Sequence, residues 1–289
     1  MSTALIQLRD VEKEVLVQDM NYQFQYVRVP DPDNLQTKYF NLFYKENNAP
    51  TWNVCPTGLL SDEYTIVKTE DAIKEIQESL NAKIIVQKNM RFYTTVRSNF
   101  VLDGFSLNLN KDTIVDKIIF KLITGVDIED IDSDTALAFS IINGFSGNIS
   151  ITLQYGFMTS YNTKEKNVSL FNPYILDEYS VSLIHDGKLK LQYDNVRDVR
   201  EQCNKRIETF KSIIPDKELF DNFEHRIPKK TFIKFMTTYN DLANEYQNLY
   251  YLTYLVSTVS DGQKKFMTEL ALRKTITDYF KSKTTPKKQ

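Results

Sequence analysis

The segment KNMRFYTTVRSNF, residues 88–100, carries cationic and aromatic side chains at alternating positions. Side chains of a β-strand point to alternate faces, so Arg91, Tyr93 and Arg97 would share one face. Guanidinium groups pair with phosphates, and a ring that stacks on a base contributes about 1 to 3 kcal/mol. An equally good account is a solvent-facing strand whose arginines pair with acids across the sheet. The candidate nucleic-acid-binding residues are Arg91, Tyr93, Arg97, Lys88, His185 and Lys188.

Side chains that could act in catalysis are scarce. The two histidines, His185 and His225, lie in no nucleophile motif. His185 precedes an Asp-Gly turn, where it fits a phosphate ligand, a base or a structural histidine. Cys55 and Cys203 are far apart and lack CxxC spacing, which excludes a zinc ribbon or a disulfide framework. No GxxxxGK[ST] loop is present, so the sequence predicts no catalytic residue and no cofactor.

One acidic stretch, VDIEDIDSDTAL at residues 126–137, offers the hard oxygen ligands that Mg²⁺ and Ca²⁺ prefer. It lacks the glycine and the terminal glutamate of a calcium loop. Asp130 and Asp132 are the candidate metal ligands, and they would serve a metal-dependent nuclease. The other interpretation is a loop that faces water or a helix start.

The segment GLLSDEYTIVKTEDAIKEIQESL, residues 58–80, predicts a strand followed directly by a helix. β-Branched and aromatic residues favour a strand at 64–67. Thr69 is the expected N-cap, and an acidic first turn suits the helix dipole. Ile73, Ile76 and Leu80 then form the predicted buried stripe.

Strand and turn signals continue to about residue 194. Strands are expected at 83–102, followed by a helix at Lys111–Leu122. The next expected elements are two hairpins, one joined through Gly144 and Gly147 and one that turns at Asp186 and Gly187. On the helix, four apolar residues should share the buried face: Ile114, Ile118, Ile119 and Leu122.

Beyond Asn195 the sequence has helical periodicity. The helical segments are expected at about Val196–Ile213, Lys217–Phe223, Lys229–Ser260 with a break, and Gly262–Phe280. Tyr239, Leu242, Tyr246 and Leu249 alternate at spacings of three and four, which is typical of a helix-packing stripe in a core or a self-association surface rather than of a nucleobase site.

Charge divides between the two parts of the chain. Residues 183–289 hold 20 Lys and Arg against 14 Asp and Glu, whereas residues 1–182 hold 16 against 24. A basic part fits either a nucleic-acid-facing module or a solvated helical surface. The lysines of the tail at 281–289 would add nonspecific phosphate affinity that weakens with salt.

These patterns predict an α+β fold with a mainly antiparallel sheet and packed helices, followed by a C-terminal helical module. The expected divisions are an α+β domain at 1–194, a helical module at 195–280 and a basic tail at 281–289. A hydrophobic content of 42% and a net charge of -2 are typical of a folded globular protein. The N-terminus lacks a signal-peptide pattern and no run of about 18 apolar residues follows, so we expect a cytoplasmic protein without a membrane partner.

Three segments carry a resemblance to a known family: GLLSDEYTIVKTEDAIKEIQESL, FSIINGFSGNISITLQYGF and SLIHDGK. Over roughly Thr57 to Asp221 the chain resembles the phage/plasmid-like DUF932 family, whose members have no assigned activity. The sequence departs from the family pattern where MTSYNTKEKN replaces an expected Cys-Asn-Gly and where Gly144 replaces a serine. The resemblance implies a mobile-element origin and a setting among replication and recombination genes.

The resulting hypothesis is a non-catalytic phage or plasmid protein that binds nucleic acid, single-stranded DNA in particular, in support of replication or recombination. We expect it to form homo-oligomers and, if phage-encoded, to act in the host cytoplasm. Two alternatives stay open. One is a protein-binding module, such as an anti-defence or phage assembly factor with a host or phage partner; the other is the metal-dependent nuclease.

Overall fold

The computed structural model describes residues 5–30, 37–56, 58–107, 113–149, 151–164, 167–172, 178–180, 182–184, 188–190, 205–259 and 266–284. It contains helices and antiparallel sheets, and its C-terminal part is helical, which confirms the predicted α+β class. The chain divides into two compact units. The first holds Met1–Asp103, Ser140–Gln154 and Glu178–Tyr193, and the second holds Gly104–Phe139, Tyr155–Asp177 and Asp194–Gln289.

The two units do not coincide with a single division after residue 194, because long strands have residues in both. These strands belong to a six-stranded sheet of order β12-β11-β10-β9-β8, in which β13 also pairs with β11. Its strands are β8 (Ile84–Phe92), β9 (Thr95–Ser106), β10 (Asp132–Gly144), β11 (Thr152–Asn162), β12 (Asn167–Asn172) and β13 (Glu178–Ser180). The expected hairpin through Gly144 joins β10 to β11, and a Cβ atom at Gly144 would lie 2.6 Å from the Ile149 carbonyl oxygen. No other residue type fits that close approach.

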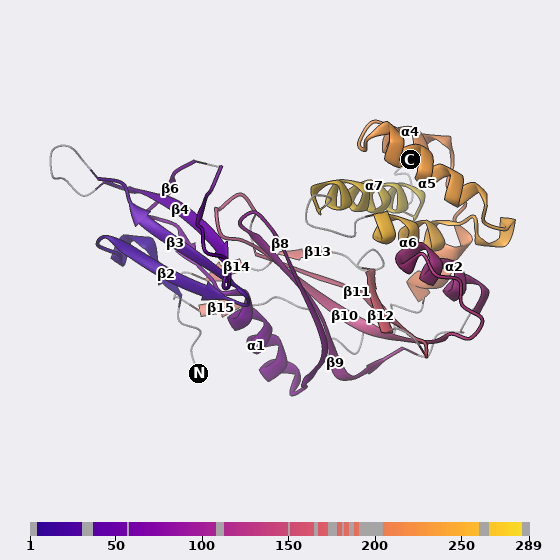
Figure 1. The fold of residues 1–289 in the computed structure, drawn as a ribbon, viewed down its shortest axis with the longest axis horizontal. Helices are drawn as coiled ribbons and strands as arrows, with labels where there is room; N and C mark the ends of the chain where they lie inside the picture. The colour runs from indigo at the N-terminus through magenta and orange to yellow at the C-terminus, as the bar shows by residue number, and fades with distance from the viewer. Residues whose placement is uncertain are drawn as a thin grey trace. The chain divides into compact units, whose positions relative to one another are not determined.

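The first unit also contains a five-stranded sheet of order β2-β3-β4-β5, with β6 paired to β4 (Figure 1). Its strands are β2 (Glu14–Asp19), β3 (Tyr22–Arg28), β4 (Tyr39–Glu46), β5 (Asn53–Val54) and β6 (Leu60–Ser61). Alternate side chains of β3 and β4 are buried, as period-two patterning predicts. They pack against Val96 and Phe145, and the Phe145 ring stacks on Phe24 at 3.9 Å between centroids.

Short elements complete this unit. The strand β1 (Ile6–Gln7) precedes a 3-10 turn, η1 (Leu8–Asp10), and pairs with β7 (Thr65–Ile66). The strands β14 (Ser182–Ile184) and β15 (Lys188–Lys190) pair antiparallel, which confirms the predicted second hairpin. Its turn residues, 185–187, lie outside the described residues.

The helix predicted after Thr69 is α1 (Thr69–Leu80), but Thr69 is not its cap. The Oδ1 atom of Asp19, at the end of β2, accepts a hydrogen bond from the Glu70 N–H at 3.1 Å. The Glu70 carboxylate reaches back to the Met20 N–H at 2.7 Å. The exchange resembles a capping box made between two distant segments, because Asp19 supplies the acceptor that Thr69 was expected to supply. The Thr69 hydroxyl instead accepts from the Asn143 side chain at 3.2 Å.

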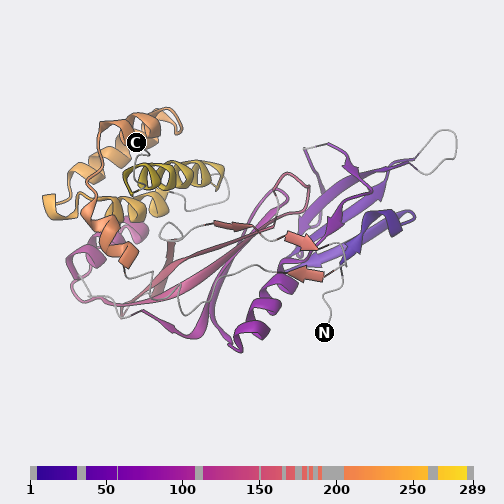
Figure 2. The ribbon, with the colours of Figure 1, turned by 180° about the vertical axis from the view of Figure 1, so that it is seen from behind.

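The second unit gathers helices, which are magenta for α2 and orange to yellow for the C-terminal ones in Figure 1, and which are seen from behind in Figure 2. They are α2 (Thr113–Thr124), a helical segment of which residues 205–212 are described, α4 (Lys217–Glu224), α5 (Lys229–Asn240), the turn η2 (Asn244–Tyr246), α6 (Leu249–Val259) and α7 (Phe266–Thr284). Among the α2 side chains that the structure describes, the buried ones are Val115, Ile119 and Phe120. The expected position of Ile114 on the buried face is wrong: it is exposed, because the face is rotated by one residue.

The predicted stripe Tyr239, Leu242, Tyr246 and Leu249 is buried throughout. Its members come from α5, the following link, η2 and α6, so the break expected within Lys229–Ser260 lies at 241–248. None of the helices within the described ranges is long and apolar enough to span a bilayer.

Candidate nucleic-acid interface

Residues 91–97 do not form one strand. Phe92 of β8 pairs with Thr95 of β9, so Tyr93 and Thr94 make a two-residue hairpin turn. Such turns require positive φ, and Tyr93 adopts φ 51°. Thr94 is fixed from outside the hairpin, because its carbonyl accepts from the Phe145 N–H at 2.9 Å and its hydroxyl donates to Ser146 at 2.8 Å. The prediction that Arg91, Tyr93 and Arg97 share one face of a single strand is therefore wrong.

Arg91 is 9% exposed and is enclosed by the first unit. Its guanidinium carbon lies 5.1 Å from the ring centroid of Tyr22 and 4.9 Å from that of Tyr44. Its Nη1 atom donates to the Tyr93 carbonyl at 2.9 Å, and Nη2 lies 3.4 Å from the Glu46 carboxylate. Burial raises the pKa of both tyrosines, and the nearby guanidinium partly offsets that rise. Arg91 therefore stabilises the hairpin and is not available to a phosphate.

Arg97 is still less accessible, at 1% exposure. Its Nε atom donates to Asn99 at 3.0 Å and to the Ser140 hydroxyl at 3.3 Å, both within the first unit. A buried cation whose Nε donor is taken up by side chains of the protein is a structural group. The two arginines cannot flank a bound strand, so the proposed cationic face is a misassignment.

The remaining candidates are separated. Tyr93 is 52% exposed and packs edge-on against Phe92 and Tyr44, at 4.6 and 6.5 Å between centroids. Lys88 is exposed on β8. His185 lies outside the described residues, and of Lys188 the structure describes only its place in β15.

The acidic stretch does not form a metal site in the described part of the chain. Asp127 pairs with Lys121 at 2.8 Å, and Asp132 begins β10. No group of three or more His, Cys, Asp or Glu side chains suited to a metal occurs among the residues described. Asp130 and Asp132 therefore gain no further ligand from the structure.

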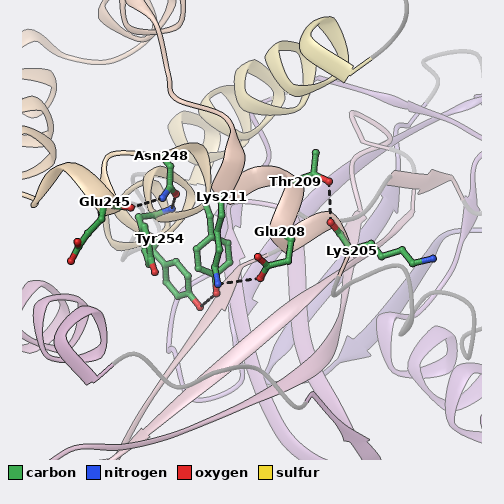
Figure 3. Close-up of polar contacts among 9 residues, drawn as sticks. Lys205, Glu208, Thr209, Lys211, Glu245, Asn248 and Tyr254 are labelled. Atoms are coloured by element: carbon green, nitrogen blue, oxygen red, sulfur yellow. Dashed lines mark hydrogen bonds and ion pairs between the residues drawn. The ribbon is translucent and has the colours of Figure 1, made fainter.

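A polar network lies within the helical unit (Figure 3). The Tyr250 and Tyr254 hydroxyls are 3.1 Å apart, and the Tyr254 hydroxyl is 3.2 Å from that of Thr159. Burial raises the pKa of Tyr250 well above its usual range. Lys211 lies over the Tyr250 ring at 5.3 Å and pairs with Glu208 at 3.3 Å. The hydroxyls satisfy one another inside the core, so this network orders the helices.

Asn248 in the same view caps α6, since its Oδ1 atom accepts from the Tyr251 N–H at 3.2 Å. We expect Asn248→Ala to lower the free energy of unfolding by about 1 kcal/mol, because an N-cap acceptor is lost. Urea denaturation measures this value. Asn240→Ala, at an exposed helix C-terminus, is the control and should change stability by less than about 0.5 kcal/mol.

A group of accessible cations lies on α5 and the connection before it. Residues 225–228 join α4 to α5, and the two helices pack through Phe223 on Phe235 and Phe220 on Tyr239. With Phe235 and Tyr239 turned inward, the opposite face of α5 is exposed. That face and the connection present Arg226, Lys229, Lys230, Ile233, Lys234 and Thr237. We call the four cations among them, Arg226, Lys229, Lys230 and Lys234, the α5 basic face.

None of the four cations makes an ion pair or a side-chain hydrogen bond to a residue within the described ranges. Lys229 and Lys230 also occupy the first turn of α5, which contains no acid, and the N-cap residue, Pro228, provides no side-chain cap. Cations there oppose the helix dipole and cost roughly 0.3 to 1 kcal/mol each. By contrast, α1 and α4 carry acids in their first turns. Helix stability therefore does not account for these lysines.

The sequence already shows the helical spacing of the residues on this face. Lys229, Lys230, Ile233, Lys234 and Thr237 recur at intervals of about one turn, but the face is defined only when the inward residues of α5 are known. Comparison of the chain with protein-family models, with curated proteins and with solved structures gave no match.

Proposed function

We propose that this protein binds nucleic acid through phosphate contacts made by the α5 basic face. The supporting observation is the set of four exposed cations, Arg226, Lys229, Lys230 and Lys234, that pair with no acid in the described part of the chain. A phosphodiester backbone is a polyanion with regularly repeated charge, and its binding is driven by counterion release. A helix also fits the major groove of a duplex.

Other anionic partners fit this face less well. A membrane-surface helix needs an apolar face to insert, whereas Phe235 and Tyr239 are already buried and Ile233 is the one large apolar side chain on the exposed side of α5. Base stacking on a single strand needs exposed rings, and the α5 basic face has none. The proposal therefore favours a duplex, with single strands as the comparison. A role in replication or recombination rests on the family resemblance alone.

The test is fluorescence anisotropy with a labelled duplex and its single strand over a series of salt concentrations. Each lost phosphate contact lowers the slope of log affinity against log salt by about 0.9 for duplex and about 0.7 for single strands. Replacing Lys229, Lys230 and Lys234 with alanine should lower the duplex slope by roughly 2.7. Folding should be retained, because all three side chains are exposed and alanine favours helix.

The matched control removes the same charge from the first unit: Lys13→Ala, Lys38→Ala and Lys83→Ala, all exposed. This variant should keep the parental slope. The proposal fails if the parent has no affinity for either nucleic acid at about 50 mM salt. It also fails if both triple variants lose affinity equally, because the effect would then be one of net charge.

A further inference from the structure

The strand β2 is the outermost strand of the five-stranded sheet (Figure 1). Antiparallel residues alternate between pairs that exchange hydrogen bonds and pairs that do not. The Arg28 N–H donates to the Lys13 carbonyl at 2.8 Å, so the odd-numbered residues of β2 bond to β3. The even-numbered residues therefore direct their N–H and C=O groups to the outer edge, where β2 pairs with no strand of the described residues. These are Glu14, Leu16 and Gln18.

This edge lacks the strongest of the usual devices against pairing. Edge strands are commonly protected by proline, by a bulge or by charged side chains, lysine above all. The edge strand β8 of the six-stranded sheet has an irregularity between Ile84 and Val86 and exposes Lys88. The sequence of β2, EVLVQD, contains no proline, lysine or bulge. Its two acids are Glu14, at the start of the strand, and the buried Asp19, and Leu16 between them is 58% exposed on the outer face of the sheet.

The free edge is complementary to itself. If two copies pair antiparallel with Leu16 opposite Leu16, each Glu14 lies opposite the Gln18 of the other copy. All three outward-directed residues then exchange hydrogen bonds, and each carboxylate faces an amide that can donate. On the inner face Val15 lies opposite Val17. A shift by two residues leaves one of the three outward-directed residues in each copy without its counterpart.

We propose that β2 is a self-association edge, at which a second copy of this chain adds its own β2 antiparallel about a two-fold axis. Strand addition of this kind supplies main-chain hydrogen bonds, and the side chains set the register. The hydrogen-bonding match between the Glu14 carboxylate and the Gln18 amide favours a second copy over an unrelated extended peptide. The inference uses only the first unit and does not depend on nucleic-acid binding by α5.

Sedimentation velocity of the full chain over a roughly hundredfold range of concentration tests the proposal, since a dimer of this kind dissociates on dilution. Gln18→Glu places two carboxylates opposite each other at both ends of the pair, and like charges directly opposite destabilise pairing. We expect it to raise the dimer dissociation constant about tenfold. Adding Glu14→Lys to Gln18→Glu creates two opposite-charge pairs and should restore the dimer.

Val54→Lys is the matched control, because Val54 is 65% exposed at the β5 end of the same sheet. It should leave the dimer unchanged, whereas Leu16→Lys should weaken it. Gln18 is exposed, and thermal melting monitors that each variant stays folded. A parent that stays monomeric at every concentration overturns the proposal. A dimer that Leu16→Lys and Gln18→Glu do not weaken, or that Glu14→Lys does not rescue, overturns it as well.

Discussion

Replacing Arg91 with alanine is expected to lower the free energy of unfolding by about 3 kcal/mol. The guanidinium lies over the rings of Tyr22 and Tyr44, and each such contact contributes about 0.5 to 2 kcal/mol. It also donates to the carbonyl of Tyr93, the residue with positive φ in the hairpin turn. Loss of the side chain leaves that carbonyl without its charged donor and opens a gap between two buried rings. Urea denaturation followed by tryptophan or tyrosine fluorescence measures the change.

Two variants define the contribution of the guanidinium. Arg91→Lys keeps the charge but loses the planar fork, so its cost should lie between those of the parent and alanine. Arg9→Ala removes a side chain that is 68% exposed and should change stability by less than about 0.5 kcal/mol. A stable Arg91→Ala variant with a reduced salt slope for DNA would contradict this account, because it would place the guanidinium at the surface.

The sequence predicts α1 well because its signals are local. The apolar spacing of Ile73 and Ile76 and the acidic first turn act within the helix itself. Its cap could not be predicted, since Asp19 reaches Glu70 from a strand about 50 residues earlier. Local sequence patterns determine where a helix forms, whereas the residue that caps it can depend on tertiary packing.

The hairpin turn at Tyr93 and Thr94 was not predicted from the sequence, for a related reason. Alternation across 91–97 suits a continuous strand, and Tyr-Thr is not one of the Asn-Gly or Asp-Gly pairs that favour such a turn. The turn is held by contacts from Phe145 and Ser146, which are distant in sequence. The α5 basic face was missed because the position of the break expected within 229–260 was not known. Only the observed end at Asn240 and the inward Phe235 define which residues share its exposed side.

The buried carboxyl of Asp19 predicts a pH dependence of stability. Burial raises its pKa from 3.8 to about 6, although hydrogen bonds from Thr69 and from the Glu70 N–H lower it. Between these two values the folded state binds the proton more tightly than the unfolded state does. This group's contribution to stability is therefore greatest at about pH 4 and below, falls as the pH rises towards 6, and is constant above that. The difference amounts to about 3 kcal/mol.

Asp19→Asn tests this directly. Asparagine keeps an oxygen that can accept from the Glu70 N–H, and it carries no charge to desolvate. We expect the variant to be more stable than the parent by about 1 to 3 kcal/mol above pH 7 and to lose the fall in stability between about pH 4 and 6. Asp10→Asn, at a side chain that is 72% exposed, should keep that fall. Other carboxyls titrate in the same range in all three proteins, so the difference between the Asp19→Asn and parental curves isolates Asp19. If the stability difference between Asp19→Asn and the parent does not change with pH, ionising the Asp19 carboxyl costs the folded state no free energy. That result would mean that β2 and α1 leave the carboxyl open to water.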